Sequence, residues 1–173
     1  MYYLDTPHTT IIHDDYILDP SIMDKLIKDT NKKRYKEEYD YTDKFNLYHR
    51  FIQEITSEFL NLHNFQHNKD KWYMDVIRYK LENEIKGVGS GLAWHCENDV
   101  TIYRNVVSVL MYLRIDEGIK EGNLRYKDKN NNKLVLKVYN GITVIMDGNV
   151  YHKPQNPYGS GIRDLIVMSF EKC

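Results

Sequence analysis

The sequence predicts a mainly β protein with helices at its N-terminal end, built as a jelly roll of two packed sheets. From Trp72 onward apolar and polar residues alternate with a period of two, and β-branched and aromatic residues dominate. Clusters of Gly, Asn and Asp divide this part into eight short apolar segments, which suits a jelly roll. Before residue 70 the apolar residues recur at helical spacing, so helices are expected to cover the outside of one sheet.

The length of 173 residues suits a single domain with one core, spanning 1–173. Within it we expect helical N-terminal support over 1–70 and a β core over 72–171. The eight expected strands are Trp72–Leu81, Leu92–Glu97, Val106–Arg114, Asn123–Lys127, Lys133–Val138, Ile142–Met146, Val150–Gln155 and Ile162–Phe170.

Two helices are expected before the strands. Asp19 and Pro20 form an N-cap followed by proline at the first helical position, and an apolar face follows over Ile22–Ile27. A longer helix is expected over Phe45–Leu62, where apolar residues recur over about five turns. The charged stretch between them, Lys32–Asp43, is interpreted as a solvated connection, with a lid beside an active site as the alternative.

The composition disfavours several classes of protein. The 24 basic and 25 acidic residues nearly balance, which disfavours a general nucleic-acid binder but leaves a local basic groove open. Two cysteines make no disulfide framework, so a reducing compartment is expected. The sequence has no apolar run long enough to cross a membrane and no signal-peptide pattern at its start, so we expect a soluble, intracellular (cytoplasmic) protein. The sequence carries no signal for an oligomeric state.

A candidate metal site comes from three residues on two expected strands. Alternate residues of a strand share a face, so His95 and Glu97 are expected to point the same way. His152 lies on a later strand, after the turn Asp147-Gly148-Asn149, and can supply a third ligand. Two histidines and one carboxylate form the facial triad of non-haem Fe(II) oxygenases. His-x-Glu by itself also fits a structural pair.

Arg163 follows His152 in the sequence and stands where the last apolar strand begins. A charge entering such a strand is costly unless it is paired, and the sequence offers no obvious inward acidic partner. A ligand carboxylate held by the guanidinium fork would serve as that partner. The alternative is a surface arginine at a strand edge.

His95-x-Glu97, then His152, then Arg163 within Gly-x-Arg resembles the signature of the 2-oxoglutarate/iron(II) dioxygenases, in the prolyl-4-hydroxylase-like branch. The resemblance covers residues 72–171. Two positions depart from the family pattern: Glu97 stands where Asp is commoner, and Asn123 replaces a second glycine. Three further stretches fit, namely Val76–Tyr79, Ser108–Leu113 followed by Glu121–Leu124, and Ile145–Asp147 followed by His152–Pro154.

The resemblance implies a double-stranded β-helix, the cupin-like form of the jelly roll, with Fe(II) held by His95, Glu97 and His152. It implies 2-oxoglutarate as cosubstrate, with its far carboxylate on Arg163 and Tyr112, although Tyr112 also fits the core. Tyr79 is expected to line the cosubstrate pocket or the substrate mouth, with core packing as the alternative. The implied reaction consumes O₂, with ascorbate as a possible added reductant, and hydroxylates a substrate with release of succinate and CO₂. A Pro or Lys side chain of a protein or peptide is the expected substrate.

Two other functions stay open. A nucleic-acid demethylase of the same superfamily would share the iron and arginine pattern but would need a basic groove. A non-oxygenase cupin metalloprotein would not need Arg163 at its spacing. A further open point is the connection Asn83–Gly91, whose three glycines favour either a mobile lid over the substrate or an ordinary wide turn.

Overall fold

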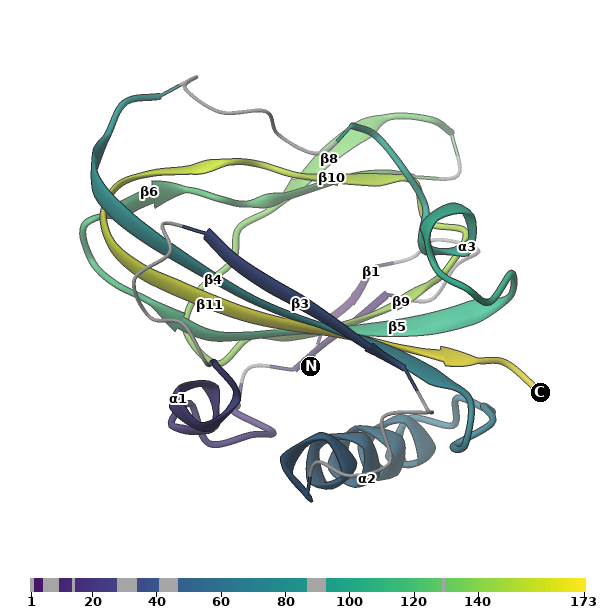
Figure 1. Cartoon of the computed structure of the whole chain (residues 1–173). Helices are drawn as coiled ribbons and strands as arrows, with labels where there is room; N and C mark the ends of the chain where they lie inside the picture. Colours follow the sequence, from purple (N-terminus) through teal and green to yellow (C-terminus); the bar gives the residue numbers. More distant parts are fainter. Residues whose placement is uncertain are drawn as a thin grey trace.

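Two antiparallel sheets face each other and enclose the space that holds the candidate site (Figure 1). The structure, a computed structural model, describes residues 2–4, 10–13, 15–27, 34–40, 47–86, 93–128 and 130–173. The larger sheet has the order β1-β2-β9-β5-β11-β4-β3, with β6 paired to β11, and the smaller has the order β10-β7-β8. The larger sheet comprises β1 (Tyr2–Leu4), β2 (Thr10–His13), β3 (Arg34–Asp40), β4 (Trp72–Glu84), β5 (Val106–Ile115), β6 (Ile119–Glu121), β9 (Thr143–Asp147) and β11 (Pro157–Glu171). The smaller comprises β7 (Leu124–Lys127), β8 (Lys133–Leu136) and β10 (His152–Pro154).

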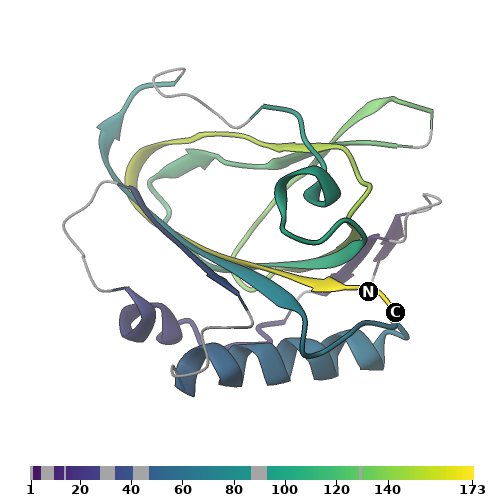
Figure 2. The same ribbon diagram turned by 45° about the vertical axis from the view of Figure 1, so that its right-hand side comes forward.

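Helices α1 (Ile22–Leu26) and α2 (Leu47–Leu62) lie against the outer face of the larger sheet, away from the smaller one (Figures 1 and 2). The third helix, α3 (Glu97–Val100), lies at one end of the space between the sheets (Figure 2). Among the described residues, the structure contains no helix with the length and apolar character needed to span a bilayer.

The larger sheet is covered on both faces, and this explains the almost uniformly apolar sequence of its central strand β5. On β5, Val107, Val109 and Met111 pack toward the helices, while Leu110 and Tyr112 pack toward the smaller sheet. Every residue from Val106 to Leu113 is therefore buried. Such a strand gives a continuous apolar run in the sequence rather than an alternating one.

A buried ion pair ties α1 to the middle of the larger sheet. Arg78 on β4 donates to both carboxylate oxygens of Asp164 on β11, at 2.6 and 2.7 Å, and to Asp24 of α1 at 2.9 Å. Asp164 follows Arg163 directly, but the pleat of the strand turns the two side chains to opposite faces. The carboxylate adjacent to Arg163 in sequence is therefore on the helix side of the sheet.

The chain before residue 70 is less helical than expected. It contains strands β1, β2 and β3 as well as the two helices. The shorter helix begins at Ile22 with Ser21 as its N-cap, rather than after Asp19. The stretch expected to be a solvated connection forms β3 over Arg34–Asp40, paired with β4 along its whole length. The charged residues of this stretch suggested a loop in solvent. An edge strand, however, can be polar and still satisfy its backbone hydrogen-bonding groups.

The expected strand Leu92–Glu97 was wrong. Within its described part, only His95 makes a β-bridge, and the chain then turns into α3 at Glu97. The other seven expected strands appear with shifted ends, and β6 was not expected. Of the connection Asn83–Gly91, the first two residues belong to β4, while 87–91 lie outside the described residues, so its role as a lid stays a prediction.

Candidate functional site

A single β-bridge joins the two histidines expected to bind metal. His95 and His152 exchange both main-chain hydrogen bonds, with N–O distances of 3.0 and 2.8 Å. Their rings lie side by side, with centroids 4.4 Å apart. The bridge connects the segment before α3 to the start of β10, so it fixes both side chains at one end of the cavity between the sheets.

Each imidazole is oriented by its own backbone. Nδ1 of His95 lies 2.9 Å from the carbonyl of Ala93, and Nδ1 of His152 lies 2.9 Å from the carbonyl of Val150. A carbonyl can only accept, so Nδ1 carries the proton in both rings. When the rings are neutral, Nε2 is unprotonated and able to act as a metal ligand, the arrangement that usually supports a histidine ligand.

Glu97 completes a three-residue cluster. Its Oε1 lies 3.1 Å from Nε2 of His152 and 3.8 Å from Nε2 of His95, and one ligand atom from each residue lies within 4.8 Å of the other two. Burial alone would raise the pKa of Glu97, but hydrogen bonds and charge attraction from the protonated forms of His152 and His95 outweigh it and lower that pKa to about 2. Two imidazoles and one ionised carboxylate form a donor set that fits a divalent transition metal.

The sequence predicted these three residues but not the way they meet. Glu97 does not share a strand face with His95. It begins α3, where a carboxylate is favoured by the helix dipole, after an extended Cys96. The turn from the β-bridge into the helix brings the carboxylate back toward the two rings.

Arg163 lies deep in the same region, with only 1% of its surface exposed. Its Nη2 donates to the Gly122 carbonyl at 2.8 Å, and its guanidinium carbon lies 5.6 and 5.3 Å from the ring centroids of Tyr79 and Tyr112. Among the described residues, no carboxylate is within ion-pair distance of Arg163. The arginine is thus not at a surface edge; it is a buried cation held by two aromatic rings and a carbonyl.

Two polar atoms beside this cation have no hydrogen-bond partner within the described part of the chain. They are Nε of Arg163 and the hydroxyl of Tyr112, both shielded from solvent. Burial raises the pKa of Tyr112 despite the nearby guanidinium, so its hydroxyl keeps its proton and can donate. Unsatisfied buried donors are costly, and a ligand carboxylate placed here would accept from both.

The metal cluster and Arg163 line the same cavity, which has a volume of about 280 Å³. Its walls include the three residues of the metal cluster, together with Arg163 and Tyr79. Inward-facing residues of β3, namely Arg34, Lys36 and Glu38, form part of another wall. The sequence reasoning missed this contribution, although the charged residues at every second position were a signal for a strand with one polar face.

Trp94 is half-buried at the surface. Its ring is parallel to that of Tyr151, with centroids 6.3 Å apart, and the ammonium of Lys127 lies over both rings. Trp94 and Tyr151 directly precede His95 and His152 in the sequence.

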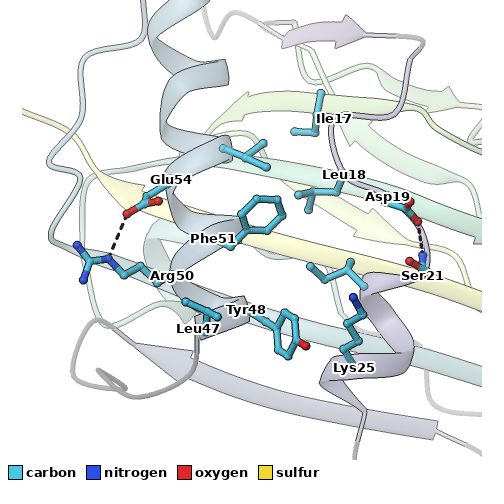
Figure 3. A pocket seen from close by; sticks show the side chains of 12 residues that line it. Ile17, Leu18, Asp19, Ser21, Lys25, Leu47, Tyr48, Arg50, Phe51 and Glu54 are labelled. Carbon is cyan, nitrogen blue, oxygen red and sulfur yellow. Dashed lines mark hydrogen bonds and ion pairs between the residues drawn. The ribbon is translucent and has the colours of Figure 1, made fainter.

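A larger hollow of about 760 Å³ lies on the outer face, between α1 and α2 (Figure 3). Apolar side chains such as Phe51 and Leu18 line it, and an exposed pair between Arg50 and Glu54 stands at its rim. Its described lining includes no histidine and no unpartnered buried charge, so the smaller cavity between the sheets is the better candidate for chemistry.

No protein-family model matches the sequence, and no curated protein matches it. Solved structures match the fold over nearly the whole chain. An oxidoreductase of the 2OG-Fe(II) oxygenase family from Burkholderia pseudomallei matches with a TM-score of 0.67 and 11% identity, covering 94% of this chain and 84% of the other. HygX from Streptomyces hygroscopicus, with nickel and 2-oxoglutarate bound, matches with a TM-score of 0.62 and 10% identity, covering 96% of this chain and 83% of the other. A prolyl hydroxylase from Trichoplax adhaerens, in complex with a hypoxia inducible factor peptide fragment, matches with a TM-score of 0.60 and 13% identity, covering 94% of this chain and 83% of the other. The chain thus has the double-stranded β-helix fold of the 2-oxoglutarate- and Fe(II)-dependent oxygenases, prolyl hydroxylases among them.

Proposed function

We propose that this protein is an Fe(II)- and 2-oxoglutarate-dependent oxygenase that hydroxylates a substrate and releases succinate and CO₂. One observation carries the proposal: the buried guanidinium of Arg163, which has no carboxylate partner among the described residues, shares a cavity with the cluster of His95, Glu97 and His152. A structural jelly roll gains nothing from an uncompensated buried cation. A cosubstrate with a free carboxylate supplies the missing charge.

Each residue of the site would have a separate role in binding the metal or the cosubstrate. His95 and His152 would bind iron through Nε2, and Glu97 through its carboxylate. When bound, the metal with O₂ and 2-oxoglutarate supplies the oxidising chemistry, with ascorbate as an added reductant. Arg163 would hold the far carboxylate of 2-oxoglutarate, and Tyr112 would donate its hydroxyl proton to the same group. Tyr79 would pack against the cosubstrate, since its ring lies over the guanidinium.

A protein or peptide side chain is the substrate class we propose. The Trichoplax prolyl hydroxylase has this fold and is in complex with a peptide fragment, which supports the proposal by analogy. Phosphate-rich substrates are less favoured, because the cavity wall formed by β3 and β4 carries two carboxylates beside its two cations and is not a basic groove.

An anaerobic titration tests the proposed function. The protein should bind one Mn(II) or Fe(II), and 2-oxoglutarate should bind only after the metal. In air, the Fe(II) form should release succinate from 2-oxoglutarate slowly without substrate and faster with a true one. Metal binding with no affinity for 2-oxoglutarate would instead identify a non-oxygenase cupin metalloprotein.

A further inference from the structure

Two carboxylates stand directly opposite each other on the cavity wall. Glu38 on β3 and Asp75 on β4 are paired in the antiparallel register, and both line the cavity that contains the metal cluster. Like charges directly opposite on one face destabilise a sheet. The stability of the sheet therefore does not explain why two carboxylates lie opposite each other here.

Lys36 compensates for only one of the two charges. Its ammonium lies 2.8 Å from Oε1 of Glu38 and 3.0 Å from Oδ2 of Asp75. Within the described ranges, no other cation is in ion-pair distance of either carboxylate. Arg34, the other cation of this wall, lies over the Tyr79 ring instead, so the group of Glu38, Asp75 and Lys36 carries one net negative charge.

The uncompensated acceptor is Oδ1 of Asp75. It is shielded from solvent, yet has no hydrogen-bond partner among the residues whose structure is described. Tyr73 stands on the same wall, and burial together with the charges of Asp75 and Glu38 raises its pKa, so it remains a neutral phenol. This group of residues therefore offers a buried acceptor and one net negative charge beside an aromatic ring.

We propose that Asp75 and Glu38, with Lys36 and Tyr73, form the subsite that recognises a cationic nitrogen of the substrate, an amine or a guanidinium. This inference rests on the proposed oxygenase function and names its substrate class. A cation with N–H donors would satisfy Oδ1 of Asp75 and balance the charge of the Glu38, Asp75 and Lys36 group. The ring nitrogen of a peptidyl proline has no N–H, so proline would leave that buried oxygen unsatisfied.

The test is a binding comparison on the metal-loaded protein without oxygen, by calorimetry with Mn(II) and 2-oxoglutarate present. The probes are Ac-Gly-Gly-Lys-Gly-Gly-NH₂, the same peptide with Nε-acetyl-lysine or with proline in place of lysine, and n-butylamine. The lysine peptide should bind about tenfold more tightly than either neutral peptide, a difference typical of one charge-assisted contact. Equal affinities, or a preference for the proline peptide, would overturn the inference.

n-Butylamine distinguishes a small-molecule amine from a lysine side chain as the substrate. If it binds as tightly as the lysine peptide, the substrate is a small amine; if it binds more weakly, the substrate is a peptide. Asp75→Asn and Glu38→Gln should each reduce the preference for lysine over acetyl-lysine by about tenfold. Glu82→Gln, an exposed carboxylate further along β4, is the matched control and should keep it. A preference unchanged in both wall variants would also refute the subsite.

Binding of Mn(II) and 2-oxoglutarate, measured in the same samples, separates the two proposals. If both bind and the lysine preference is absent, only the substrate inference fails. If 2-oxoglutarate does not bind the wild type, the proposed function itself fails. The peptide ranking on the wild type decides the inference even if a wall variant does not fold.

Discussion

Arg163 and Gly122 are in direct contact. The guanidinium donates to the Gly122 carbonyl, and a Cβ on Gly122 would lie 3.3 Å from the Cζ and Nε atoms of Arg163. Gly122 also has a φ of +80°, a conformation that side chains rarely adopt. The backbone at this glycine therefore determines where the guanidinium lies.

Replacing this glycine should displace the arginine. Gly122→Ala should weaken 2-oxoglutarate binding about tenfold and lower the stability by about 1–2 kcal/mol, the cost of a left-handed residue with a side chain. Titration calorimetry and thermal unfolding measure the two effects. Gly141→Ala is the control, because Gly141 has a similar φ of +84° but approaches only the half-exposed ring of Tyr16. Similar loss of 2-oxoglutarate affinity in both variants would show that Gly122 acts only through general strain.

Removing the buried guanidinium should abolish tight cosubstrate binding and leave the metal in place. Arg163→Ala should cost about 2–5 kcal/mol of 2-oxoglutarate binding, the range for losing one partner of a buried charge pair. Arg163→Lys should restore only part of it, because an ammonium cannot form the planar two-bond contact. Calorimetry in the presence of Mn(II) gives both values. Wild-type affinity in the alanine variant would exclude Arg163 from the cosubstrate site.

The metal should depend on both bridged histidines. We expect His95→Ala and His152→Ala to lose stoichiometric Mn(II) binding, because each removes one of two oriented Nε2 ligands. Equilibrium dialysis followed by metal analysis measures the stoichiometry. His67→Gln is a suitable control, because that ring is engaged with Ser57 and the Phe65 carbonyl. One metal per chain in both alanine variants would refute the site.

The ion pair beneath the sheet should be a strong contributor to stability when only one partner is changed. Asp164→Asn leaves the Arg78 guanidinium buried without a full counter-charge, and should destabilise the protein by about 3–5 kcal/mol. Urea unfolding measures the loss. The exposed pair Arg50–Glu54 supplies the comparison, and Arg50→Ala should change stability by less than about 1 kcal/mol. If the two substitutions cost the same, the buried pair has no special role.

The sequence by itself determined the order of the β core and the residues of the candidate site. The apolar segments and the turn residues between them located seven of the eight expected strands, because these signals are local in the sequence. The spacing of His95, Glu97, His152 and Arg163 identified the residues that the fold brings into one cavity. The sequence alone named these side chains as candidate metal ligands and as a candidate partner for a ligand carboxylate.

Only the tertiary structure decided how these residues meet. The β-bridge between His95 and His152 joins positions far apart in the sequence, and the turn into α3 that carries Glu97 follows directly from that bridge. Strand β3 exists because β4 supplies its hydrogen bonds, so its charged sequence alone resembles a loop. The contact of Gly122 with Arg163, and the facing carboxylates of Glu38 and Asp75, arise from strand register. Register is set by long-range pairing, which a local sequence pattern does not encode.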